Sequence, residues 1–223
     1  MDAVRIFIGS DIYNVKAERA LIFSIKHHAS VPTECNIMSR FDQHDTWTGW
    51  QCTDQWATCF SCFRWGIPAA CGFEGRAIYL DSDQIVLADI AKLANIDLKG
   101  KAIGTTPKRE SSVAVFDCAK FKDWDQFQLD DLKQNAAKTN QYYKWLRDAG
   151  EVEFISQQWN CLDGEGYDPV ETKLIHYTKL TTQPWHPAPH RFQYKPHDRP
   201  DLVEIWRRYY ELSYDHPEVL EKP

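Results

Sequence analysis

The sequence predicts a single α/β domain with a mixed, mostly parallel sheet flanked by helices. Residues 4–38 contain a strand-like apolar run, a helix-like run and a second strand-like run, which is how a nucleotide-binding α/β sheet begins. A third apolar run ends in two acids, and open α/β sheets place their ligands at the carboxyl ends of strands. The chain has 223 residues and no low-complexity linker, so we expect one domain over residues 1–223.

The first unit is a buried strand over Val4–Gly9, a tight turn, a helix over Val15–His28 and a strand over residues 35–38. Apolar residues recur on one face of this helix, and Asp11 or Asn14 can cap its first turn. The first strand is not followed by a G-x-G-x-x-G sequence, so a dinucleotide-binding fold is not supported.

The later elements are shorter. The loop over residues 41–55 is either a functional segment or an ordinary surface excursion, and the helix after it is expected to stop near Gly66 and Pro68. In chain order the predicted elements are a helix over residues 54–65, a strand over 77–80, a strand or helical turn over 85–93, strands over 101–104 and 113–116, a helix over 130–148, a strand or turn over 151–155, a strand over 173–177 and an amphipathic helix over 199–212.

Composition excludes several classes of protein. Hydrophobic residues make up 43% and charged residues 26%, as in a soluble globular protein, and no apolar run approaches the ~20 residues of a transmembrane helix. The net charge of −6 argues against a general nucleic-acid binder, which needs a basic face. The first residues do not resemble a secretory signal. Seven cysteines are then best explained as reduced thiols in a cytoplasmic protein.

Four of the cysteines lie close together in the sequence: Cys52, Cys59, Cys62 and Cys71. Cys59 and Cys62 form a C-x-x-C pair, which is compatible with a structural zinc site. The aromatic residues around this pair have helical spacing, which favours small buried side chains instead. Both interpretations stay open.

Asp81 and Asp83 follow the apolar run Ala77–Leu80. In an extended chain, residues two apart project to the same side, so the two carboxylates form a hard-oxygen site for Mg²⁺ or Mn²⁺. A bare Asp-x-Asp after a strand is also a common polar turn.

Several segments together resemble one family. Phe63–Pro68 and Gly75–Ile90 resemble the donor-site core of the glycogenin-like glycosyltransferases, which include bacterial lipopolysaccharide galactosyl- and glucosyltransferases. Ser111–Asp117 resembles their Asn-Ser-Gly-Val strand, and His176–Trp185 resembles their late His-Phe-x-Gly-x-x-Lys-Pro-Trp motif. The resemblance spans residues 4–185 and implies the GT-A fold. It also implies metal-dependent transfer of a hexose, with retention, from a UDP-sugar to a carbohydrate, lipid-linked or protein acceptor.

The resemblance also implies a set of site residues. Asp81, Asp83 and His176 would hold Mn²⁺, which tolerates one imidazole among oxygen ligands better than Mg²⁺ does. Tyr13 would stack on the uracil, or else pack on the core. Arg64 would meet the donor phosphates or fix the Asp-x-Asp loop, unless it forms only a surface ion pair. The full set expected around the donor is Gly9, Ser10, Asp11, Tyr13, Arg64, Ser82 and Lys179.

The family has an Asp-Gln pair followed by Asn near the reacting face of the sugar. Here the best match is Gln157-Gln158-Trp159-Asn160, with Asp163 shortly after. Because Gln is a poor nucleophile, a front-face route assisted by the leaving phosphate is easier to defend than double displacement. Asp163 is the second candidate for a nucleophile.

The chain departs from the family pattern in three places. The Ser-Ser strand lacks the family's Asn-Ser-Gly. Lys179 stands where Gly is usual and Gln183 where Lys precedes Pro-Trp, and we infer that Lys179 supplies the missing cation to the diphosphate. The C-terminal extension is reduced to a Pro-rich tail and a helix over residues 186–223.

Three alternatives remain open. A nucleotidyltransferase would need a Gly-rich basic loop after the first strand, which is absent here. A non-catalytic nucleotide-sugar-binding protein of the same fold fits the Gln157–Gln158 pair. A zinc-stapled structural or interaction protein fits the cysteine cluster. The sugar, the acceptor and the oligomeric state do not follow from the sequence.

Overall fold

The computed structural model describes residues 3–38, 47, 49, 59–108, 111–122, 129–134, 136–187, 189–190 and 192–222. Its main sheet has six strands in the order β2-β1-β3-β6-β5-β7. The β1/β2, β1/β3 and β5/β7 pairs are parallel, whereas β6 is antiparallel to both of its neighbours. The strands are β1 (Val4–Gly9), β2 (Thr33–Ile37), β3 (Arg76–Asp81), β5 (Ile103–Thr105), β6 (Val113–Asp117) and β7 (Val152–Phe154). The expected mixed, mostly parallel sheet is therefore confirmed.

A second, three-stranded sheet lies next to the carboxyl end of β3. It has the order β4-β9-β8, with β4 over Gln84–Val86, β8 over Cys161–Leu162 and β9 over Leu174–His176. Only Ser82 and Asp83 separate β3 from β4, so the chain turns directly from one sheet into the other. The antiparallel β4/β9 pair places Gln84 opposite His176, which brings the end of β9 to this turn.

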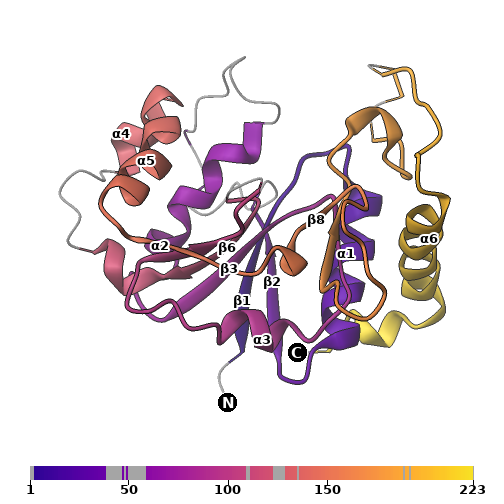
Figure 1. Cartoon of the computed structure of the whole chain (residues 1–223), viewed down its shortest axis with the longest axis horizontal. Helices are drawn as coiled ribbons and strands as arrows, with labels where there is room; N and C mark the ends of the chain where they lie inside the picture. Colours follow the sequence, from indigo (N-terminus) through magenta and orange to yellow (C-terminus); the bar gives the residue numbers. More distant parts are fainter. Residues whose placement is uncertain are drawn as a thin grey trace.

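Helices cover both faces of the main sheet (Figure 1). The helices α2, α4 and α5 lie on one side, and α1 and α6 lie next to each other on the other side. Their bounds are α1 (Val15–His28), α2 (Ile67–Ala70), α3 (Ile90–Ala94), α4 (Leu129–Gln134), α5 (Ala136–Asp148) and α6 (Pro200–Asp215). Short 3₁₀ helices cover Cys59–Gly66, Cys118–Phe121, Gln157–Trp159, Leu180–Thr182 and Pro217–Val219.

Strand alternation divides the interior into two main cores, since successive side chains of a strand point to opposite faces. Phe7 of β1 and Tyr79 of β3 belong to the core under α5. Ile8 of β1 and Leu80 of β3 belong to the core under α1 and α3. A third core fills the space between α1, the small sheet and α6 and contains Ile85, Tyr177, Trp185 and Trp206. Trp206 is thus buried in this core and does not contribute to the exposed face of α6.

Two local predictions are wrong. The 3₁₀ helix Cys59–Gly66 ends at Gly66 as expected, but Pro68 does not end a helix: it lies in the first turn of α2, where its missing N–H costs nothing. Neither Asp11 nor Asn14 caps α1. Asn14 occupies the N-cap position, but its amide oxygen accepts a hydrogen bond from the Trp185 indole at 2.9 Å, so a long-range contact takes the place of the local cap.

Several ambiguous segments are settled. Residues 85–93 contain both the strand and the helical turn that were weighed for them, since β4 is followed by α3. Residues 151–155 contain the strand β7. The helix expected over 130–148 corresponds to α4 and α5, with residue 135 between them outside the described residues, and the C-terminal helix extends to Asp215. The loop over residues 41–55 lies outside the described residues except for Trp47 and Gly49. Trp47 is buried, with its ring centroid 6.0 Å from that of Phe7.

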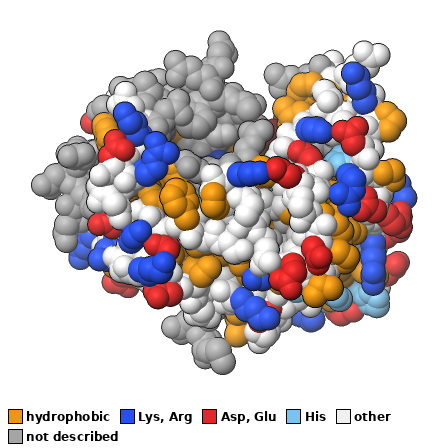
Figure 2. Space-filling view, viewed as in Figure 1, with side chains coloured by type: hydrophobic (Ala, Val, Ile, Leu, Met, Phe, Trp, Pro, Cys, Tyr) orange, Lys and Arg blue, Asp and Glu red, His pale blue; other side chains and the backbone are white. Residues whose placement is uncertain are grey.

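None of the described helices is long and apolar enough to cross a bilayer. On the described part of the face shown in Figure 2, acidic and basic side chains are interspersed. This face therefore presents no continuous basic patch of the kind that binds nucleic acid.

Candidate metal and donor site

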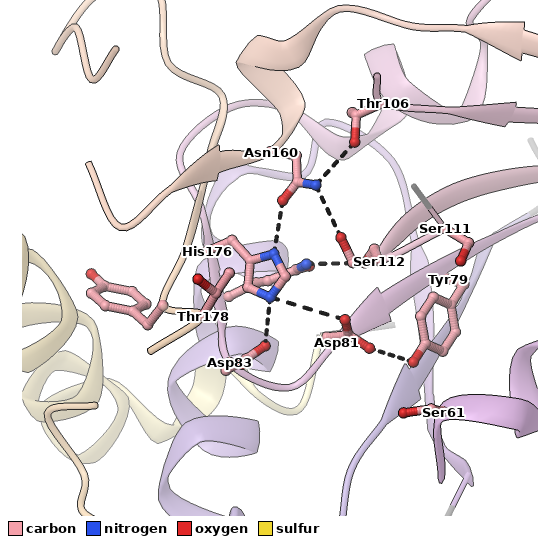
Figure 3. A network of polar contacts seen from close by, with 12 residues as sticks. Ser61, Tyr79, Asp81, Asp83, Thr106, Ser111, Ser112, Asn160, His176 and Thr178 are labelled. Atoms are coloured by element: carbon pink, nitrogen blue, oxygen red, sulfur yellow. Dashed lines mark hydrogen bonds and ion pairs between the residues drawn. The ribbon is translucent and has the colours of Figure 1, made fainter. Parts of the chain in front are cut away.

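Two carboxylates and one imidazole converge at the carboxyl end of β3 (Figure 3). Asp81 is the last residue of β3, Asp83 lies in the turn to β4, and His176 is the last residue of β9. One ligand atom from each lies within 4.8 Å of the other two. The backbone N–H of Tyr177 donates to the Asp83 carbonyl oxygen at 2.9 Å, which fixes the end of β9 against the turn.

The His176 ring is held from both sides and its side chain is only 4% exposed. Nε2 lies 3.0 Å from Asp83 Oδ1 and 4.0 Å from Asp81 Oδ2, and Nδ1 lies 2.8 Å from Asn160 Oδ1. Burial opposes the charged ring, but Asp83 and then Asp81 outweigh it, and the pKa of His176 lies above its usual value. The two carboxylates therefore stabilise a positive charge next to them.

Asp81 is oriented by two neighbours. The Tyr79 hydroxyl donates to Asp81 Oδ1, and Arg64 Nη2 lies 3.4 Å from the same oxygen. The Arg64 guanidinium also lies 4.2 Å from the centre of the Tyr79 ring, a cation–π contact. Burial, together with the charge of Asp83, raises the pKa of Asp81, although Arg64 acts in the opposite direction.

Asp83 uses its two carboxylate oxygens differently. Oδ2 accepts a hydrogen bond from Gln183 Nε2 at 3.1 Å, and the same amide donates to the Tyr177 carbonyl at 2.8 Å. Oδ1 is buried, has no hydrogen-bond partner among the described residues and lies 3.0 Å from Nε2 of His176. Gln183, which stands where the family has Lys, therefore contacts this carboxylate without neutralising it.

This donor set fits a divalent cation. Two carboxylate oxygens and one imidazole nitrogen face a common point, and one of these oxygens lacks a hydrogen bond. Within the described residues, Arg64 brings one positive charge into contact with Asp81. Mixed oxygen and imidazole ligands suit Mn²⁺, while oxygens alone suit Mg²⁺.

The turn after β1 lies beside this group. Gly9 pairs with Asp81 across the sheet, and its carbonyl accepts a hydrogen bond from Ser82 N at 2.9 Å. The Ser10 hydroxyl donates to Glu18 at 2.6 Å and is buried, and Asp11 Oδ1 accepts from Tyr13 N at 2.9 Å. These two side chains thus stabilise the turn.

Tyr13 is 39% exposed, so it is not a core aromatic. Its ring centroid lies 5.5 Å from that of His190 in the tail. An exposed aromatic ring on this turn is compatible with stacking on a base.

The two expected donor-phosphate cations have protein partners. Arg64 contacts Asp81 and also donates to the carbonyl of Ser111 and, at 3.0 Å, to its hydroxyl, which favours its role in fixing the Asp-x-Asp loop. Lys179 Nζ lies 3.1 Å from Asp198. Lys179 is therefore paired with the tail.

The residues expected near the sugar lie around β8. Gln157 Oε1 accepts from Lys108 N at 2.9 Å and its Nε2 donates to the Asn160 carbonyl at 2.6 Å. Gln158 Nε2 donates to Glu171 at 2.9 Å. Gln157, Gln158 and Asn160 line a cavity of about 290 Å³ that also contains Lys108.

Asp163 has a different environment. It has a positive φ of 45°, and its carboxylate accepts hydrogen bonds from the Thr178 hydroxyl and from Lys179 N. His197 Nε2 lies 3.8 Å from Asp163 Oδ1. These contacts attach the segment after β9 and the tail to the turn after β8.

Sequence analysis did not place Tyr79, Asn160 or Gln183 at the metal site, although the last two stand in segments that match family motifs. Tyr79 stands two residues before Asp81, so strand alternation places both side chains on one side and could have identified it. Asn160 and Gln183 reach the site through tertiary contacts, and no local spacing predicts which ligand each one touches.

The cysteine cluster is only partly described. Cys52 and the side chain of Cys59 lie outside the described residues. The Cys71 and Cys118 thiols are hydrogen-bonded to each other, which lowers the pKa of Cys71 and raises that of Cys118. Burial raises the pKa of Cys62 to about 11. The zinc interpretation stays a hypothesis.

Comparisons with known proteins agree with this fold. The model of the glucosyltransferase 24 family matches residues 73–143, which include Asp81 and Asp83. Protein CDI of Arabidopsis thaliana is 27% identical over 212 residues, covering 82% of this chain and 80% of that protein.

Solved structures show the same fold at low sequence identity. The apo glycosyltransferase GlyE of Streptococcus pneumoniae superposes with a TM-score of 0.63 at 16% identity, over 99% of this chain and 63% of GlyE. The galactosyltransferase LgtC, solved with donor and acceptor sugar analogues, superposes with a TM-score of 0.59 at 12% identity, over 93% of this chain and 95% of LgtC. This chain thus spans less than two thirds of GlyE. The family model thus matches about a third of the chain, and the solved structures show that the chain has the fold of these GT-A glycosyltransferases.

Proposed function

We propose that this chain is a metal-dependent glycosyltransferase that moves a hexose from a UDP-sugar to an acceptor with retention of configuration. Asp81, Asp83 and His176 would hold Mn²⁺, or Mg²⁺, at the carboxyl end of β3. The observation that carries the proposal is the convergence of these three side chains within 4.8 Å in a GT-A fold. Support also comes from LgtC, which was solved with donor and acceptor sugar analogues.

The divalent ion, when bound, supplies a Lewis acid that neutralises the departing diphosphate. Residues of the chain position the side chains that would bind the ion. Tyr79 and Arg64 hold the Asp81 carboxylate, and Gln183 holds Asp83. The turn after β1 offers the exposed Tyr13 ring to the base. Lys179, which is 55% exposed at its side chain, can exchange Asp198 for a donor phosphate, because an exposed ion pair contributes little stability.

We propose a front-face route at the sugar. The bond from the acceptor oxygen to the anomeric carbon forms on the face from which the diphosphate leaves, and the acceptor proton passes to a phosphate oxygen. Gln157 is an amide and can stabilise charge but not attack; an active-site Gln variant of LgtC is among the solved structures of this fold. The Asp163 carboxylate is engaged by Thr178 and Lys179, which argues for a structural role.

The test is a calorimetric titration of UDP, with GDP and ADP as controls, with and without Mn²⁺. We expect tight binding of UDP only with Mn²⁺ in the wild-type protein. Asp83→Asn removes one anionic ligand but keeps the shape of the side chain, so it should abolish this metal-dependent binding while the fold survives. If wild-type protein binds no nucleotide under either condition, or if Asp83→Asn binds as wild type does, the proposed site is wrong.

A second candidate is a non-catalytic nucleotide-sugar-binding protein. The amides at Gln157 and Gln158, in place of a carboxylate, favour it. Incubation with a panel of UDP-sugars and Mn²⁺ separates the two functions, because an enzyme slowly releases UDP by donor hydrolysis and a binding protein does not. The transfer of a hexose and the cytoplasmic location stay predictions.

A further inference from the structure

Asn160 lies at the centre of a buried polar network behind the metal-site group (Figure 3). It follows the 3₁₀ helix Gln157–Trp159 and precedes β8, and it is completely buried. Its side chain joins His176 to the ends of β5 and β6. None of the roles described above uses this residue.

The orientation of the Asn160 amide is determined by its partners. One amide atom faces Thr106 Oγ1 at 2.9 Å, Ser112 Oγ at 3.0 Å and the Lys108 carbonyl oxygen at 3.2 Å. A carbonyl oxygen can only accept a hydrogen bond, so this atom must be the NH₂ group. The amide oxygen therefore points at His176 Nδ1, 2.8 Å away.

The amide oxygen in turn decides which ring nitrogen of His176 carries the hydrogen. An amide oxygen accepts and cannot donate, so Nδ1 must donate to it. In a neutral imidazole the other nitrogen then carries the lone pair. That nitrogen, Nε2, faces Asp83 Oδ1 at 3.0 Å and Asp81 Oδ2 at 4.0 Å, which is the direction in which a metal ligand has to point.

Without Asn160 the neutral His176 ring would prefer the opposite tautomer. Asp83 Oδ1 has no hydrogen-bond partner in the described part of the chain, so a neutral ring without Asn160 would place its hydrogen on Nε2 and donate it to this oxygen. A protonated Nε2 cannot bind a cation. The carboxylates alone therefore select the tautomer that blocks the metal, and an acceptor on the far side of the ring is needed to select the other one.

From this geometry we infer that Asn160 is a positioning residue that holds His176 in its metal-binding tautomer and orientation. The inference rests on the proposed metal site and adds a requirement to it. Partners of this kind, which orient a ligating histidine from behind, typically change metal affinity by about 10- to 100-fold when they are removed.

The test compares two substitutions of nearly equal size. Asn160→Leu removes the acceptor, and we expect Mn²⁺ affinity, measured by calorimetry without nucleotide, to fall by about 10- to 100-fold. Asn160→Asp keeps an acceptor oxygen toward Nδ1 and should retain most of the affinity. A folded Asn160→Leu protein that binds Mn²⁺ as wild type does would show that Asn160 serves packing alone. A wild-type protein that binds no Mn²⁺ would instead overturn the proposed metal site itself.

A second measurement does not depend on the stability of any variant. In ¹⁵N NMR spectra of the metal-free wild-type protein, at a pH where the ring is neutral, Nδ1 of His176 should show the shift of a protonated nitrogen and Nε2 that of an unprotonated one. The opposite assignment would refute the inference directly.

Discussion

Gly9 is the position where the structure predicts the sharpest effect of one added methyl group. A Cβ atom at Gly9 would lie 2.8 Å from Phe60 Cδ2 and 3.0 Å from Tyr79 Cζ, and closer still to the Tyr79 hydroxyl. Both rings are buried, so neither can move aside cheaply. Overpacking of this kind costs about 1–3 kcal/mol. We therefore expect Gly9→Ala to destabilise the fold and to displace Tyr79 from Asp81.

Tyr79→Phe supplies the matching half of a double-mutant cycle. By itself it removes the hydrogen bond to the Asp81 carboxylate, and a bond to a charged group contributes about 1.5–3 kcal/mol. It also removes the atom that lies nearest to the new methyl group. Gly9→Ala should thus cost less in the Tyr79→Phe protein than in wild type, with a coupling of about 0.5–3 kcal/mol.

The assay is urea unfolding of the four proteins of the cycle. Tyr177→Phe provides a matched control, because the Tyr177 hydroxyl is also buried and bonded, to the Leu202 carbonyl at 2.7 Å, but it belongs to the core beside α6. Gly9→Ala should be additive with Tyr177→Phe. The reasoning would be refuted if the free energies of unfolding lost in Gly9→Ala and Tyr79→Phe also added within about 0.5 kcal/mol. It would equally be refuted if Gly9→Ala did not destabilise the wild-type protein.

Three further predictions concern the donor base, the metal and a helix cap. Tyr13→Ala should weaken UDP binding in calorimetry by about 5- to 150-fold, since stacking on a base contributes about 1–3 kcal/mol, whereas Tyr13→Phe should not; equal binding by all three proteins would remove Tyr13 from the base site. Mn²⁺ at 100 times its Kd should stabilise the wild-type protein by about 2.7 kcal/mol in thermal unfolding. A chelator or Asp83→Asn should abolish this gain, and an equal gain in Asp83→Asn would place the ion elsewhere. Asp89 caps α3 by accepting from Ala91 N at 3.0 Å, so Asp89→Ala should cost about 1 kcal/mol at neutral pH. Burial opposes the charge, but hydrogen bonds from Ser30 and Ala91 outweigh it and lower the pKa of Asp89. Its contribution is therefore present above the unfolded-state value of about 4 and is lost as the pH falls through the folded value. A difference between Asp89→Ala and wild type in urea unfolding that stays constant down to pH 3 would contradict this.

Much of the fold could be predicted because its signals are local. The β1-α1-β2 unit was predicted with α1 at its observed bounds, since one apolar face of a helix and one buried strand are visible in short stretches of sequence. The strand order could not be obtained in this way. β3 pairs with β1 and β6, and β5 with β6 and β7, and these pairings depend on packing between segments far apart in the chain.

The predicted cap of α1 failed because a distant partner overruled it. Asn14 has the right side chain and the right position to cap α1, but the Trp185 indole uses its amide oxygen. The indole lies 171 residues further along the chain.

The sequence by itself determined that Asp81 and Asp83 follow a buried apolar strand and that His176 lies in a later strand, because apolar strand runs are local properties. Only the tertiary structure decided what each of these side chains faces. The β4/β9 pairing brings His176 to the two carboxylates, and buried amides from Asn160 and Gln183 then contact His176 and Asp83. The physical reason is that a buried polar atom must find its partner in three dimensions, and the sequence carries no local record of that choice.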